Sequence, residues 1–392
     1  MLRQKGFTSF FGSQMYQQLV PENHFLRKTD ELITWMPVIQ KITPCYKGEF
    51  TLGASALNPI IPFKMMFLGY LYNLSDRDLE RMCNDTISFK YFIEIGIDEA
   101  APDHSTLSLF RKRIIEYYED ESAFEEIFLE LLEQIIAAGI QLGDVQAIDS
   151  KHLNARVSQH RQTKKGKEQK AKEKEKNQKR KEEGKKEKDY RSKQDIDKEA
   201  SVGCKGIEKK KDKNGKIVEM PKWFFGYKAH CSVESNHDLV TSAILTPGNE
   251  DDGSFFEPLF MKDIAVRHSI PKGYTADKGY DYGDSHFLLN QLGINNGIYL
   301  KEARLKNDAL HALWHTLNNS EEHKKTKKHR FKVERTFGDL HNNHKLKDCF
   351  SFGRIKAAIQ MFMSAIVHNL KKAVKEIYGV SHKTPTNLVF RT

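Results

Sequence analysis

Three acidic residues, far apart in the sequence, occupy positions from which their side chains could meet. Asp149 follows the run 145–148, and Asp277 follows the short run 273–276, and we expect both runs to be strands that end on these acids. Glu334 lies in a segment that we expect to be helical. If the two strands are neighbours, the aspartates lie at one edge of the sheet, and a helix packed on that sheet can place Glu334 beside them.

Carboxylates gathered in this way repel one another unless a cation neutralises them. Mg²⁺ and Mn²⁺ take oxygen ligands, usually a few carboxylates together with water and substrate phosphate. Two such ions, about 3.5–4 Å apart, can hold the attacking and leaving oxygens of an in-line phosphoryl displacement. The order acid on strand, acid on strand, acid on helix therefore favours a site for two Mg²⁺ ions, with Mn²⁺ as a substitute.

Each acid by itself also fits a plainer role, and spacing alone leaves both interpretations open. Asp277 could belong only to a tight turn with Lys278 and Gly279, and Glu334 could be a surface residue of a charged helix. No other metal site competes in the sequence, because the histidines lack H-E-x-x-H spacing and the five cysteines form no C-x-x-C pair. The cysteine pattern also disfavours a disulfide scaffold and a zinc ribbon.

The net charge of +10 is concentrated in one segment. Residues 161–198 hold 17 Lys/Arg and 9 Asp/Glu, a net of +8, which leaves only +2 for the rest of the 392 residues. The same segment has almost no apolar side chains, so it cannot form a packed core. We expect a solvated insertion, helical or disordered, and the overall basicity does not by itself identify a nucleic-acid partner.

Apolar stretches are too short for a membrane span, which needs roughly 18 consecutive apolar residues, and the first residues lack the apolar block of a secretion signal. Five scattered cysteines fit a reducing compartment. The sequence therefore predicts a soluble, cytoplasmic protein without a membrane partner.

The first part of the chain has helical rather than strand patterns. Apolar residues in 24–42 recur at helical spacing, and we expect Pro37 to break or kink that helix. Ser75 and Asp103 each precede a new helical run and are predicted N-caps. An all-α region over 1–140 fits either a scaffold or dimerisation bundle or a module that binds DNA ends.

Strand patterns begin near residue 144 and make the whole chain a mixed α+β protein. A hairpin is predicted from 223–233 and 239–245, followed by alternating helices and strands and a late helix that contains 357–374. Hairpin strands first and β-α-β units later favour a mixed sheet covered by helices. We predict four regions with the following bounds: helical region 1–140, catalytic domain 141–378, charged insertion 160–218 within it, and C-terminal tail 379–392.

The motifs around the three acids resemble those of bacterial insertion-sequence transposases of the DDE superfamily, in the insertion-sequence-five-like group. The most specific match is Thr275 to Tyr280 around the second acid, and Arg330 stands four residues before Glu334 as in that family. The resemblance covers most of the chain. It is carried by 71–80, 102–107, 147–151, 226–230, 246–252 with Asp252, 275–280, 331–340 and 365–372.

This resemblance implies a ribonuclease H-like domain interrupted by the charged insertion, and metal-dependent cleavage and strand transfer of DNA. It implies that Asp149 and Asp277 contact metal directly and that Glu334 contacts a second ion. The implied partner is double-stranded DNA, both the terminal repeats of an element and its target, bound by a homodimer near the nucleoid. The residues expected to contact DNA are Arg330, Arg335, Lys278 and Lys345.

Two departures from the family pattern affect the expected DNA contacts. A tyrosine is common seven residues before the glutamate, where this chain has Lys327, and a basic residue is common seven after it, where this chain has His341. Lys345 and Lys347 are close enough to substitute. The alternatives are a nuclease of the same fold without strand transfer, a DNA-binding descendant that has lost its chemistry, and a helical partner-binding scaffold.

Overall fold

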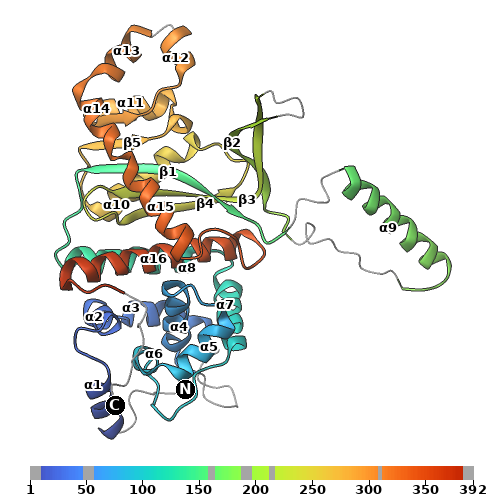
Figure 1. Ribbon diagram of the computed structural model, residues 1–392, viewed down its shortest axis with the longest axis vertical. Helices are drawn as coiled ribbons and strands as arrows, with labels where there is room; N and C mark the ends of the chain where they lie inside the picture. Colours follow the sequence, from blue (N-terminus) through green and yellow to red (C-terminus); the bar gives the residue numbers. More distant parts are fainter. Residues whose placement is uncertain are drawn as a thin grey trace.

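The computed structural model describes residues 10–46, 57–157, 164–186, 197–211, 217–307 and 311–382. Helices of the N-terminal part lie at one end of the molecule, and a sheet flanked by later helices lies at the other (Figure 1). The predicted mixed α+β class, with an N-terminal helical region and a helix-covered sheet, is confirmed. The predicted tail 379–392 lies mostly outside the described residues.

The N-terminal part is helical, as predicted, and both predicted caps are present. The Ser75 side chain accepts a hydrogen bond from the Asp78 N–H, and the Asp103 side chain accepts one from the Thr106 N–H. The helices are α1 (Phe10–Leu19), α2 (Phe25–Leu32), α3 (Met36–Ile42), α4 (Ile60–Leu71), α5 (Asp76–Asp85), α6 (Ile87–Phe92), α7 (His104–Tyr118) and α8 (Ser122–Ala137).

The helix break predicted at Pro37 lies slightly earlier. α2 ends at Leu32 and α3 begins at Met36, so Pro37 stands in the first turn of α3 rather than at the interruption. Proline is tolerated there because the first N–H groups of a helix have no partner within the helix. The predicted interruption is therefore correct in kind and displaced by a few residues.

α4 is buried along its whole length, including Lys64. The Lys64 ammonium lies 2.8 Å from an Asp30 carboxylate oxygen and 2.7 Å from one of Glu94, on neighbouring segments. A buried ammonium needs such partners because desolvation penalises an unpaired charge. The pair of acids thus allows a lysine in an otherwise apolar central helix.

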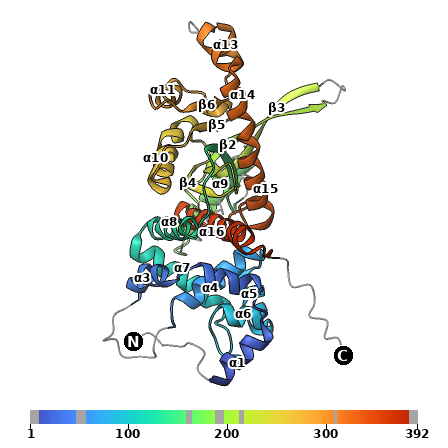
Figure 2. The same ribbon diagram turned by 90° about the vertical axis from the view of Figure 1, so that its left-hand side faces the viewer.

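The sheet has the strand order β2-β3-β1-β5-β6. β4 pairs with residues 227–233 of β3, on the side of β3 that faces away from β1. β1 pairs antiparallel with β3 and parallel with β5, and β5 pairs parallel with β6. Helices then cover the two faces (Figure 2). The strands are β1 (Val145–Asn154), β2 (Ser201–Lys211), β3 (Ile217–Glu234), β4 (Val240–Pro247), β5 (Gly273–Ala276) and β6 (Asn295–Ile298).

The helices of this part occur where the sequence patterns predict alternation with strands. α10 and α11 lie between successive strands, and α15 and α16 end the described chain. The helices are α10 (Phe256–Arg267), α11 (Gly283–Gln291), α12 (Glu302–Asn307), α13 (His311–Asn319), α14 (Glu321–Lys327), α15 (Phe331–Asn343) and α16 (Arg354–Tyr378).

The charged insertion divides into two kinds of structure. α9 (Lys164–Glu182) projects away from the body of the molecule, as expected for a segment with no apolar face (Figure 1). Its second half differs from the prediction, because residues 201–211 form β2 and residues 217 and 218 begin β3. β2 pairs with β3, the next strand in the chain, and the charged composition of 201–211 did not indicate a strand.

One continuous hydrophobic core joins the N-terminal helices to one face of the sheet. α16 and α8 lie between these two parts (Figure 1), and the core includes Phe67 from α4, Val233 from β3 and Ile366 from α16. A second core under α10 and α11 covers the other face. Because the first core is shared, no separate core marks the boundary predicted at residue 140, and the four domain bounds stay predictions.

Two further expectations concern the membrane and the cysteines. Within the described ranges, no helix combines the length and apolar character needed to cross a bilayer. All five cysteines are free thiols in the structure.

Candidate active site

Strand register places Asp149 next to Asp277. Ile148 of β1 pairs with Ala276 of β5 in a parallel ladder, so the next residue of each strand stands at the same edge. β1 does not end at Asp149 as predicted but continues to Asn154, because its other side stays paired with β3. The carboxylate therefore lies where the parallel pairing stops, on a strand held firmly by its antiparallel neighbour.

Short hydrogen bonds fix both aspartates. Asp149 Oδ1 accepts from the Ser150 N–H at 2.8 Å, and Asp277 Oδ1 accepts from the Gly279 N–H at 2.7 Å. The turn that Lys278 and Gly279 were predicted to form is present as a 3₁₀ helix capped by Asp277. The capping role and a site role are compatible, because the bond to Gly279 uses only one carboxylate oxygen.

A third aspartate, Asp252, approaches the same edge. A Cβ added at Gly279 would lie 2.8 Å from Asp277 Oδ1 and 3.2 Å from Asp252 Oδ2, so glycine leaves room for the two carboxylates to converge. Asp252 Oδ1 is paired at 2.9 Å with the Lys228 ammonium. This residue is visible in the sequence only through the 246–252 motif.

Arg330 connects Glu334 to Asp149. The Arg330 guanidinium lies 2.6 Å from Glu334 Oε1, one turn along the chain, and 3.6 Å from Asp149 Oδ2. It also lies over the Tyr299 ring at 5.4 Å. Arg330 was expected to contact DNA, and in the structure its guanidinium is paired with two acids of the candidate site.

The electrostatics of this edge favour a bound cation. Burial, and next the neighbouring Asp277 carboxylate, raise the pKa of Asp149 to about 7, although the charge of Arg330 acts in the opposite direction. A carboxylate with this pKa is costly to ionise near neutral pH, and a divalent cation would remove that cost. Asp149, Asp277 and Glu334 offer the oxygen donors that Mg²⁺ and Mn²⁺ prefer. Among the described residues these three carboxylates do not all lie within 4.8 Å of one another.

Behind the acids lies a buried histidine that sequence reasoning did not single out. His230 on β3 hydrogen-bonds Tyr280 Oη at 3.2 Å and Thr246 Oγ1 at 3.0 Å, and stacks on Phe255. Burial lowers the pKa of His230 to about 4, so it is neutral. His230 thus supports Tyr280, which follows the second acid in the chain. In the sequence, the 226–230 motif was the signal that pointed to His230.

The four predicted DNA-contacting residues do not lie together. Arg330 and Lys278 lie beside the acids, and Lys278 is half-exposed with an ion pair to Glu302 at 3.3 Å. Arg335 instead pairs with Asp238 in the β3–β4 turn. Lys345 points toward the N-terminal helices, where its ammonium donates to the Leu74 carbonyl between α4 and α5.

The position of Lys345 does not favour a phosphate contact. Its ammonium also lies over the rings of Tyr70 at 5.1 Å and Phe350 at 5.5 Å. Burial lowers the pKa of Lys345 to about 8. The Lys345 side chain thus links the C-terminal end of α15 to the N-terminal helices. Lys347 is exposed and is better placed to contact a phosphate.

A separate cluster on α15 and α16 has metal-ligating types. Asp339, His344 and His368 place one ligand atom each within 4.8 Å of one another, the one such group in the described part of the chain. The Lys371 ammonium already pairs with the Asp339 carboxylate and lies 2.6 Å from His344 Nε2. The group therefore contains its own cation, and it holds α15, with Glu334, against α16.

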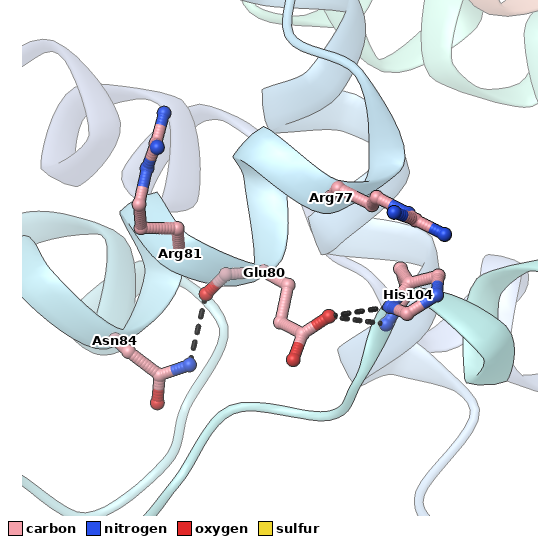
Figure 3. Close-up of a pocket in the computed structure, with 5 residues that line it drawn as sticks. All are labelled: Arg77, Glu80, Arg81, Asn84 and His104. Atoms are coloured by element: carbon pink, nitrogen blue, oxygen red, sulfur yellow. Dashed lines mark hydrogen bonds and ion pairs between the residues drawn. The ribbon is translucent and has the colours of Figure 1, made fainter.

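A pocket of about 380 Å³ lies in the N-terminal helices, away from the acids. It is lined by Arg77, Glu80, Arg81, Asn84 and His104 (Figure 3). Glu80 accepts hydrogen bonds from the His104 backbone N–H at 2.9 Å and from its ring Nδ1 at 2.7 Å. The two arginines line the same opening on the α5 side.

Two adjacent parallel strands carrying acids, with a third acid on a covering helix, define the class of DDE-type transposases. Residues 140–370 match the family model described as Transposase DDE domain, and residues 14–113 match Transposase domain (DUF772). The chain therefore belongs to the Transposase DDE domain family, as its motifs indicated.

One curated relative is named Transposase for insertion sequence element IS1106, from Neisseria meningitidis serogroup B. It is 28% identical over 170 residues, which cover 43% of this chain and 54% of that protein. The match thus spans about half the length of the curated relative. No solved structure is significantly similar to the chain.

Proposed function

We propose that this protein is a DNA transposase that cleaves at the ends of an insertion sequence and joins the freed 3′-hydroxyl to target DNA. The observation that supports this most is the register of β1 and β5, which sets Asp149 beside Asp277 at one edge of the sheet. Arg330 pairs with both Asp149 and Glu334, which supports a role for Glu334 near the two aspartates. Family membership supports the same reaction class.

In this proposal Asp149 and Asp277 hold one Mg²⁺ ion, and Glu334 helps to hold a second, with Mn²⁺ able to substitute. When bound, such ions activate water and stabilise charge on the scissile phosphate. Arg330 pairs with Asp149 and Glu334, so it would stand beside a scissile phosphate if divalent ions took these carboxylates as ligands. The ion pair between Asp252 and Lys228 adds further polar groups to the site.

The proposed partner is double-stranded DNA, both the terminal repeats and the target. Lys278 and Arg330 are placed to contact phosphates near the acids. A homodimer is proposed because joining two ends requires both to be held at once. Residues 1–140 are proposed as the end-binding or dimerisation region, and their pocket with Arg77 and Arg81 is open to an anionic group.

The test is an in vitro reaction with the terminal DNA of the element, a target plasmid and Mn²⁺ or Mg²⁺. Wild-type protein should yield cleaved ends and joined products, and Asp277→Asn should yield neither while still binding DNA. Asp144→Asn is the matched control, because Asp144 is an exposed aspartate paired with Lys272 at the opposite end of β1.

The outcomes separate the alternatives. Cleavage without joining of a pre-cut end would indicate a nuclease of the same fold. DNA binding with no metal-dependent product would indicate a non-catalytic descendant. Unchanged product from Asp277→Asn would remove the proposed metal role of that residue.

A further inference from the structure

A two-stranded ribbon extends from the sheet beside the acids. β2 and the first half of β3 pair antiparallel, from Lys211 with Ile217 at the outer end to Cys204 with Trp223 near the base. Both views show this ribbon leaving the body of the molecule (Figures 1 and 2). Residues 217–223 of β3 are exposed, and burial begins only at Phe224, so this half of the strand is not part of the core.

Positive side chains gather at the base of the ribbon. Lys205 of β2 lies over the Phe224 ring at 5.6 Å, and His152 of β1 lies beside the same ring at 5.3 Å. Lys222 of β3 and Lys151 of β1 are close enough for their charges to lower the pKa values of both Lys205 and His152. His152 is only three residues beyond Asp149, about 10 Å along an extended strand.

These cations are only weakly neutralised by the protein. Lys151 and Lys222 have no ion pair among the described residues. Burial first, and then the charges of Lys205 and Lys151, lower the pKa of His152 to about 4, so His152 is neutral and the lysines carry the charge of this surface. Burial and the charge of Lys222 lower the pKa of Lys205, and the Asp348 carboxylate acts in the opposite direction. Such a surface favours an anionic ligand.

The ribbon also exposes large apolar side chains. Trp223 is 56% exposed, directly after Lys222, while the other two tryptophans, Trp35 and Trp314, are 8% and 6% exposed. Ile217 and Met220 are more than half exposed on the same strand. An exposed indole between basic residues is energetically unfavourable in water and well suited to a surface that carries both charge and flat apolar groups.

We propose that the β2–β3 ribbon binds duplex DNA beside the acidic site, with Lys151, Lys205 and Lys222 on phosphates and Trp223 packed against the DNA. This inference rests on the proposed function. A two-stranded ribbon fits the major groove, and basic side chains at its base would position the backbone next to Asp149. A protein partner would instead require an acidic surface opposite these lysines, which makes DNA the better occupant.

Tryptophan fluorescence tests the proposal directly. Because Trp223 is the exposed tryptophan of the three, acrylamide should quench mainly its emission in the free full-length protein. Addition of a terminal-repeat duplex should reduce the quenching constant about twofold or more, since a groove contact excludes solvent from the indole. Trp223→Phe should remove this change and identify the responding residue.

Charge substitutions provide the second measurement. Lys205→Ala with Lys222→Ala should weaken duplex binding about tenfold or more at 0.15 M salt and reduce the slope of log K against log salt by about two. Lys272→Ala with Lys375→Ala is the charge-matched control, because both lysines are exposed and lie outside the ribbon and the proposed end-binding region. This control should leave affinity and slope nearly unchanged, and melting temperatures should confirm that all variants fold.

The outcomes distinguish this inference from the proposed function. DNA binding with unchanged Trp223 quenching and an unchanged salt slope in Lys205→Ala with Lys222→Ala would overturn the ribbon assignment and leave the transposase proposal standing. Protection of Trp223 that depends on protein concentration, and not on DNA, would assign the ribbon to a second copy and overturn the DNA contact. Absence of all DNA binding would overturn both.

Discussion

The guanidinium of Arg330 on the segment before α15 lies 3.6 Å from the carboxylate of Asp149 on β1. The same guanidinium pairs with Glu334 at 2.6 Å. One cation therefore links two of the three acids across the sheet–helix boundary. Arg330 occupies the electrostatic role that a divalent ion is proposed to take, and this exchange can be tested.

Arg330→Gln should raise the pKa of Asp149 above about 7, because the guanidinium is the charge that lowers it. The pKa can be followed through the side-chain carboxyl carbon by NMR in metal-free protein. Arg335→Gln is a matched control on the same helix, since Arg335 pairs with Asp238 instead. An equal pKa in Arg330→Gln and wild type would show that the pair with Asp149 is not formed in solution.

Asp149→Asn should stabilise the metal-free protein at pH 8. The pKa of Asp149 is raised to about 7 from 3.8, so the folded protein keeps a proton that the unfolded chain has lost between these values. Wild-type stability therefore falls as pH rises from about 4 to 7, by about 2–4 kcal/mol from this group. Urea unfolding at pH 4.5 and pH 8 should show a difference between variant and wild type only at pH 8.

Divalent ions should stabilise the wild type at neutral pH. At a Mn²⁺ concentration of 100 times the dissociation constant, the gain in unfolding free energy is about 2.7 kcal/mol for one site. Asp277→Asn should lose most of the associated rise in melting temperature, and Asp144→Asn should retain it. A rise of equal size in Asp277→Asn would place the ion elsewhere.

Asp339→Asn should destabilise the protein by about 2 kcal/mol, since it leaves the Lys371 ammonium without its carboxylate in a mostly buried network. Burial opposes ionisation of Asp339, but hydrogen bonds from His344, His368 and Lys371 hold its pKa far below the usual range. A depressed acid pKa contributes stability above the unfolded value, and this is lost only as pH falls through the folded value. The difference from wild type in urea unfolding should thus persist from pH 8 to pH 5 and shrink only in stronger acid.

The sequence alone was sufficient for elements that depend on local chemistry. The caps at Ser75 and Asp103 were predictable because a side-chain oxygen bonds an N–H only a few residues away. The turn after Asp277 was predictable for the same reason, and the short strand before it was indicated by its residue types. The family motifs indicated which acids belong to one site. Neither periodicity nor spacing in the sequence could predict whether these acids lie near one another.

Tertiary structure decided the partners of the charged residues. Arg335 and Arg330 lie five residues apart on one helical segment, yet one faces Asp238 and the other Asp149. Lys345 was expected on a DNA-facing surface and lies against Tyr70 instead. These outcomes depend on how α15 is rotated between the sheet and α16, which the packing of both neighbours determines.

The β2–β3 ribbon is a second feature that the local sequence did not predict. β2 is rich in charge, so its sequence resembles that of a solvated insertion, and its pairing with β3, the next strand in the chain, makes it part of the sheet. The amino-acid sequence determined the residue types, the local turns and the alternation of helix and strand. Which acids share an edge, which cations they meet and where the ribbon points were decided by strand register and helix packing, because both arise from contacts between segments distant in the chain.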